Sequence, residues 1–151
     1  MDRAPLADPE LRTYLRRLSY VHADLLAWVR ALPEGGLDAP APNRDGTVRE
    51  TLKHIADTEL FYLSRMGQRI TMEREPEDVI SRLIDYRARA VEAILRLSPR
   101  QRDLVYVPTE QPSEDPEEGW TLRKVLRRML EHEIEHLHAL QNADITREIA
   151  G

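Results

Sequence analysis

The sequence predicts an all-α protein, a four-helix bundle of up-down-down-up topology with a long crossover between helices three and four. Apolar residues recur at helical spacing in four segments of about 20 residues each, and Pro/Gly-rich breaks separate these segments. Residues 104–119 contain three prolines and several acids, which is typical of an irregular crossover. A chain of 151 residues can bury one sizeable core, so we expect residues 1–151 to form a single domain.

The first two helices are bounded by recognisable start and stop signals. The first is predicted from Asp8 to Ala31, and it ends before the Pro-Glu-Gly-Gly break at 33–36. The second begins in the sequence TVRE, which is typical of a capping box in which Thr47 caps the helix and Glu50 reaches back. Its apolar spacing continues to about residue 67.

The third and fourth helices are bounded in the same way. The third is predicted to open at 75–78, with Pro76 in its first turn and acids at the positive end of the helix dipole, and to stop at Ser98-Pro99. A short helical turn to Asp103 follows. The fourth helix is predicted to begin at Trp120-Thr121, with Thr121 as its cap, and to run to Gln141.

Composition narrows the classes of function. The net charge is −5, and no Lys/Arg cluster lacks interspersed acids, so nothing favours nucleic acid or an anionic membrane as a partner. The absence of Cys excludes disulfides and thiolate metal ligands. No apolar run approaches the ~20 residues of a membrane span, and the N-terminus has no signal-peptide core, so we expect a soluble, cytoplasmic protein. Bundles of this size commonly form homodimers, although no sequence feature defines an interface.

One motif on the predicted fourth helix points to a metal. The segment HEIEH places His132 and His136 four residues apart, on one face of the helix, where two neutral imidazoles can bind one divalent ion. What kind of site this is depends on a third ligand. His54 lies on the corresponding flank of the second helix, so the two flanks could face each other. A lone histidine at a helix edge is, however, more often solvated or hydrogen-bonded than a ligand.

The same motif is also the signature of zinc metalloproteases, in which the glutamate polarises water and a third ligand lies downstream. Only a short tail follows the pair, with His138, Asp144 and Glu148 as candidates, and His138 points to the wrong side of the helix. The chain also lacks strand signals for the substrate-aligning sheet of such enzymes. Glu133 falls near the centre of the apolar stripe, which favours a buried structural carboxylate over a general base.

A second group of ionisable residues is predicted to point into the bundle. His22 and Glu59 fall at the centres of the apolar stripes of the first and second helices, as Glu133 does on the fourth. Because an unpaired buried charge is costly, we expect these three residues to form a hydrogen-bonded network with Arg87 or Tyr86. Two alternatives stay open: the glutamates orient the metal-binding imidazoles, or a slight helix rotation takes one of the three residues to water.

Two segments resemble a known family, the DinB-like metalloenzyme superfamily. They are TVRETLKHIADTELFYL, which contains His54, and GWTLRKVLRRMLEHEIEHLHAL, which contains His132 and His136. Members of this family are four-helix bundles with a histidine in the second helix and an H-x-x-x-H pair in the fourth. The resemblance therefore implies that His54, His132 and His136 are the metal ligands. The family pattern often continues with a further His or Gly-Gln, and here the sequence LHALQ leaves His138 as a substitute ligand.

The resemblance also implies a class of activity. Three neutral imidazoles leave a metal its full charge and an open position, so it can lower the pKa of a bound water or thiol. Characterised relatives are similar to thiol-dependent transferases and isomerases, which implies a transferase that activates a low-molecular-weight thiol. A metal-dependent hydrolase and a non-catalytic metal-binding or interaction bundle are the alternatives. The set of ligands admits zinc, nickel, iron or manganese, and no catalytic side chain or substrate is specified.

Overall fold

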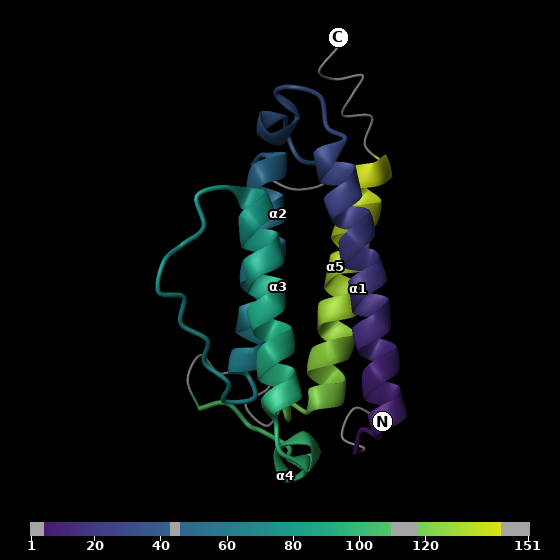
Figure 1. Ribbon diagram of the computed structural model, residues 1–151, viewed down its shortest axis with the longest axis vertical. Coiled ribbons are helices and arrows are strands. Elements are labelled where there is room, and N and C mark those ends of the chain that lie inside the picture. The colour runs from purple at the N-terminus through teal and green to yellow at the C-terminus, as the bar shows by residue number, and fades with distance from the viewer. Residues whose placement is uncertain (1–4, 43–45, 110–117, 143–151) are drawn as a thin grey trace.

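Four long helices make up the bundle in the computed structural model, which describes residues 5–42, 46–109 and 118–142 (Figure 1). In chain order the helices are α1 (Asp8–Arg30), α2 (Val48–Ser64), α3 (Val79–Arg96), the short α4 (Pro99–Asp103) and α5 (Leu122–Asn142), with a 3₁₀ turn, η1, at Gly36–Asp38. The predicted fold class is confirmed, and so is the predicted short helix that runs to Asp103. The predicted ends of α1 and α5 are correct within one residue. No helix in the described part of the chain is both long and apolar enough to cross a membrane.

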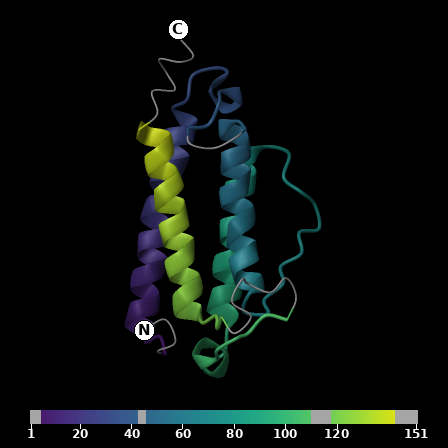
Figure 2. The same cartoon turned by 180° about the vertical axis from the view of Figure 1, so that it is seen from behind.

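The helices run up, down, down and up, as predicted. α1 and α5 rise from the end of the bundle that carries α4, whereas α2 and α3 descend towards it (Figures 1 and 2). α2 packs against both α3 and α5, and α1 packs against α5. This arrangement places the two predicted histidine-bearing helices, α2 and α5, side by side.

The crossover that returns along the bundle lies elsewhere than predicted. Because α2 and α3 point the same way, the chain must travel back the length of the bundle between them, and residues 65–78 do so outside the helices (Figure 2). The connection between α3 and α5 is long in sequence, as predicted, but both of its ends lie at the same end of the bundle. Prolines indicate a break in the helix, but they do not indicate how far the following segment travels.

The third helix begins later than predicted. The carboxylate of Asp78 accepts hydrogen bonds from the Ser81 amide at 2.8 Å and from the Ser81 hydroxyl at 2.9 Å, so Asp78 is the cap and Val79 is the first helical residue. Pro76 therefore lies before the helix rather than in its first turn. The prediction failed because both an early proline and an aspartate can start a helix, and here the aspartate supplies the hydrogen bond.

The caps predicted for α2 and α5 are present. Thr47 Oγ1 accepts a hydrogen bond from the Glu50 amide at 3.2 Å, and Thr121 Oγ1 accepts one from the Lys124 amide at 3.2 Å. The Thr47–Glu50 pair makes only this half of the predicted capping box. These caps satisfy amides of the first helical turn and so help to set where each helix begins.

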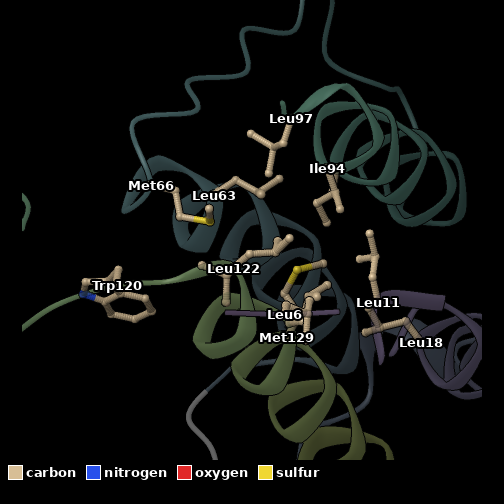
Figure 3. Close-up of a cluster of buried hydrophobic side chains, with 13 residues drawn as sticks. Leu6, Leu11, Leu18, Leu63, Met66, Ile94, Leu97, Trp120, Leu122 and Met129 are labelled. Carbon is tan, nitrogen blue, oxygen red and sulfur yellow. The ribbon is translucent and has the colours of Figure 1, made fainter. Parts of the chain in front are cut away.

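The core consists of two hydrophobic clusters stacked along the bundle axis. The cluster nearer α4 contains Leu63 of α2, Ile94 of α3 and Met129 of α5 (Figure 3). The other cluster, towards the opposite end, contains Leu25 of α1 and Leu83 of α3. Each cluster draws side chains from all four long helices, because each helix carries one continuous apolar stripe.

Shortening a core leucine should have a large, localised effect. Leu126 of α5 is fully buried in the cluster nearer α4. We expect Leu126→Ala to lower the free energy of unfolding by about 2–5 kcal/mol, since it removes buried methyl groups and leaves a cavity. Leu95→Ala is the matched control because Leu95 is 56% exposed. Chemical denaturation of both variants measures the difference, and equal losses would contradict the described core.

Candidate metal centre

The three predicted metal ligands lie together between α2 and α5. His132 Nε2 is 3.0 Å from His54 Nε2 and 3.1 Å from His136 Nε2. All three side chains are half-buried, and one nitrogen of each lies within 4.8 Å of the others. The structure thus brings the histidine of the second helix to the pair on the last helix.

The geometry of these nitrogens suits a single metal ion. Zinc–imidazole bonds of about 2.0–2.1 Å in a tetrahedral site separate the ligand nitrogens by roughly 3.3 Å. The two distances that involve His132 Nε2 would have to lengthen by only a few tenths of an ångström to reach that spacing. The ring planes stand 65–78° apart, so the rings approach edge-on and their Nε2 atoms can converge without stacking. Three imidazoles fill one side of an ion and leave further coordination positions open.

Thr58 lies where it can hold one of the imidazoles in the tautomer that suits a metal ligand. Its hydroxyl donates a hydrogen bond to the carbonyl of His54, one turn earlier on α2, at 2.6 Å. Since that proton is used, the Thr58 oxygen can accept from His54 Nδ1, which lies 3.5 Å away. A proton on Nδ1 leaves the lone pair on Nε2, the atom that faces Nε2 of His132. A hydrogen bond to the remote nitrogen of a metal-binding histidine orients the ring in this way.

Removing this hydroxyl should weaken metal binding without unfolding the protein. We expect Thr58→Val to reduce the affinity for Zn²⁺ about 10-fold, the lower range for losing such a supporting hydrogen bond. Thr13→Val is the matched control, because Thr13 makes the same kind of bond to the carbonyl of Pro9 on α1, at 3.0 Å and far from the histidines. Competition titration with a chelator measures both. Equal affinities in the two variants would show that Thr58 has no such role.

The ring of Tyr62 packs beside the three histidines. The sequence alone did not identify this residue as part of the site. Its ring meets that of His132 at 89°, with centroids 6.1 Å apart, and also contacts Trp120. Burial raises the pKa of Tyr62, although Arg128 opposes the shift, so the phenol keeps its proton at neutral pH. Its position two turns after His54 on the same face of α2 was the signal that could have identified it.

The substitute ligand considered from the sequence lies outside this group. His138 is exposed, and it is not among the described residues that converge on a common point. His138 lies two positions after His136, which is more than half a turn around the helix. Its side chain therefore leaves α5 in another direction. The structure therefore groups His54 with the α5 pair and leaves His138 apart.

The predicted buried network is present. Glu133 accepts from His22 Nδ1 at 2.8 Å through one oxygen and from Arg87 at 2.9 Å through the other. Arg87 also donates to Glu59, with its Nε at 2.9 Å. Of the two α3 residues considered, Arg87 is therefore the partner, and Tyr86 instead packs beneath another arginine. The hydrogen bonds of the two glutamates go to Arg87 and His22, so neither carboxylate orients His54, His132 or His136.

Electrostatics separates this network from the candidate metal centre. Burial raises the pKa of Glu59 despite the opposing charge of Arg87. For Glu133, burial acts in the same direction, but the bond from His22 and the charge of Arg87 outweigh it and lower its pKa. His22, Glu59 and Glu133 also bring ligand-type atoms within 4.8 Å of one another, yet the permanently charged Arg87 is bonded to both carboxylates. A second cation would be repelled there, so the metal candidate is the three-histidine group.

Fold and site together define the class: a four-helix bundle with a candidate three-histidine metal centre between its second and last long helices. A family model described as the DinB superfamily matches residues 4–140. The chain belongs to this superfamily. No curated protein matches the chain.

Two solved structures share the fold. One is titled TT2238, a four-helix bundle protein; it is 22% identical with a TM-score of 0.64, over 87% of this chain and 98% of that one. The other is YfiT from Bacillus subtilis, titled a probable metal-dependent hydrolase with an unusual four-helix bundle topology. It is 18% identical with a TM-score of 0.68, over 96% of this chain and 90% of that one. At these identities the likeness establishes the fold alone.

Proposed function

We propose that His54, His132 and His136 bind one divalent metal ion, and that the protein is a metal-dependent enzyme that activates a low-molecular-weight thiol for transfer to an electrophile. The observation that carries the proposal is the convergence of three Nε2 atoms in a half-buried position between α2 and α5. A divalent cation bound there would lower the pKa of a thiol or water that shares it.

The residues of this chain suit that chemistry in three ways. The ligand set contains no carboxylate, so it does not reduce the charge that favours a thiolate. A hydrogen bond from His54 Nδ1 to Thr58 would direct the lone pair of His54 at the site, and the Tyr62 ring lies against His132 on one side of it. The three imidazoles are only half-buried, so the site can be reached from solvent. In the transfer itself, the thiol proton passes to solvent, the sulfur forms a bond to an electrophilic carbon, and the leaving group departs with its bonding electrons.

The proposal is tested by adding thiol to the Co²⁺-loaded protein. Binding of a thiolate at this centre predicts a sulfur-to-cobalt charge-transfer band that saturates with thiol, and turnover of a chlorodinitrobenzene that requires both metal and thiol. His132→Ala is the control because it lacks one ligand. A band that is absent at saturating cysteine and dithiothreitol, in protein that holds cobalt, would refute thiol activation.

A metal-dependent hydrolase is the second candidate, favoured by the similarity to YfiT, whose title names that activity. The same three histidines would then serve to activate water. This function predicts that the metal-loaded protein cleaves activated esters or amides without added thiol. A protein that binds metal but turns over neither class of substrate would instead be a metal-binding bundle. The identity of the metal among zinc, nickel, iron and manganese is read from elemental analysis of the purified protein.

A further inference from the structure

A polar layer crosses the middle of the bundle, between its two hydrophobic clusters. On each long helix, one buried polar residue separates the part that enters one cluster from the part that enters the other. These residues are His22 on α1, Glu59 on α2, Arg87 on α3 and Glu133 on α5. We call these four residues the polar layer.

Arg87 joins all four helices at this level. From α3 it donates to Glu59 of α2, to Glu133 of α5 at 2.9 Å and to the carbonyl of Leu18 of α1 at 2.9 Å. His22 adds a second link between α1 and α5, because its Nδ1 lies 2.8 Å from Glu133. Each bond has a direction, so together they define how each helix is turned about its own axis.

The metal-binding histidines depend on that rotation. They are half-buried and lie at the edges of the apolar stripes rather than at their centres. At the radius of a side chain, turning one helix by about 20° moves its tip by roughly 2 Å, which is far more than a metal–ligand bond tolerates. Glu133 directly follows His132 and precedes His136 by three residues, so a bond to Glu133 holds the turn of α5 that carries both ligands.

The polar layer is a poor device for stability alone. Among the described residues, His22 Nε2 and Glu59 Oε2 are buried without a hydrogen-bond partner, which leaves the network incompletely satisfied. Buried charge networks of this kind are often no more stabilising than apolar residues of the same volume, and their best-attested use is to specify one arrangement.

We propose that the polar layer sets the rotation of α5 against α2 and so places His132 and His136 opposite His54, with Arg87 as the principal positioning residue of the metal centre. This inference rests on the metal binding proposed above. It assigns the network a role in metal affinity, although none of its side chains is a ligand.

The test replaces the layer by apolar residues and measures metal binding. The variant His22→Leu, Glu59→Met, Arg87→Met, Glu133→Met removes one cation and two anions together, so no buried ion is left without a partner. The matched control is Asp57→Leu, Arg82→Met, which removes an α2–α3 ion pair with bonds of 2.9 and 2.8 Å that does not reach α5. Each protein is titrated with Zn²⁺, and its Co²⁺ absorption spectrum is recorded at saturation.

We expect the apolar-layer variant to unfold cooperatively, to bind Zn²⁺ at least 10-fold more weakly than the wild type, and to give an altered Co²⁺ spectrum. The control should stay within twofold of the wild type and keep its spectrum. A folded apolar-layer variant with wild-type affinity and spectrum overturns the inference and leaves the proposed function intact. A wild type that binds neither ion overturns both.

A milder variant tests the positioning role of the polar layer if the fourfold replacement does not fold. Arg87→Lys keeps the positive charge between the two glutamates but lacks the planar fork that reaches three helices at once. We expect it to bind Zn²⁺ at least threefold more weakly than the wild type. Unchanged affinity in folded Arg87→Lys would likewise overturn the inference.

Discussion

Replacing His54 with alanine is expected to remove nearly all metal from the purified protein. The wild type should carry about one metal ion per chain, whereas His54→Ala should retain less than about a tenth of that after dialysis. The reason is geometric: the Nε2 atoms of His54 and His132 lie 3.0 Å apart, so the loss of His54 removes the contribution of α2 to the site. Elemental analysis of both proteins, purified side by side, measures the result.

His138→Ala is the matched control for this measurement, since it deletes an exposed histidine of α5. Its metal content should equal that of the wild type. If His54→Ala also kept its metal, the site would have to be local to α5, and the pair His132 and His136 would need a different third ligand.

Replacing Arg87 with alanine is expected to destabilise the protein by about 3–5 kcal/mol, the cost of removing one partner from a buried ion pair. Arg87 is 7% exposed, and its removal leaves Glu59 and Glu133 buried near each other without their shared cation. Urea unfolding at pH 7 measures the loss. Arg96→Ala is the control, because Arg96 pairs with Glu92 on the surface of the same helix and its loss should change stability by less than about 0.5 kcal/mol.

The pH dependence of the Arg87→Ala variant provides a second check. Burial already raises the pKa of Glu59, and Arg87 opposes that shift, so removing Arg87 should raise it further. A carboxyl whose folded pKa lies above its unfolded value favours the folded state while protonated and loses that contribution as pH rises through the folded pKa. The stability deficit of the variant should therefore shrink as pH falls from 7 to 5. A deficit that grew over this interval would contradict the described surroundings of Glu59.

Local sequence signals located the helices well and the connections less well. Thr47 and Thr121 were recognisable as caps because a hydroxyl before an apolar run satisfies the same orphan amides in any fold. The start of α3 was missed because Pro76 and Asp78 are both start signals, and only the bond to Ser81 selects between them. The lengthwise crossover at 65–78 was missed because the direction of a connection depends on where the next helix packs.

The candidate site likewise contains residues that the sequence identified and residues that it did not. His132 and His136 are a local pair, and helical spacing alone places them on one face. The flank of α2 that carries His54 made it a candidate, but its assignment as a ligand came from a family resemblance, since no local pattern states which two helices become neighbours. Thr58 and Tyr62 were not recognised at all, because a threonine and a tyrosine on a helix face have a role only once the imidazole beside them is known.

By itself, the sequence determined the four amphipathic helices, the absence of thiolate ligands, the α5 histidine pair and the three ionisable residues that had to enter the core. These properties follow from helical periodicity and from the cost of burying charge, which act within single segments. Only the tertiary structure decided that α2 lies beside α5, that Arg87 rather than Tyr86 completes the network, and that residues 65–78 return along the bundle. The packing of helices depends on contacts between segments that are distant in the sequence. The apolar periodicity of one helix does not indicate which other helices pack against it.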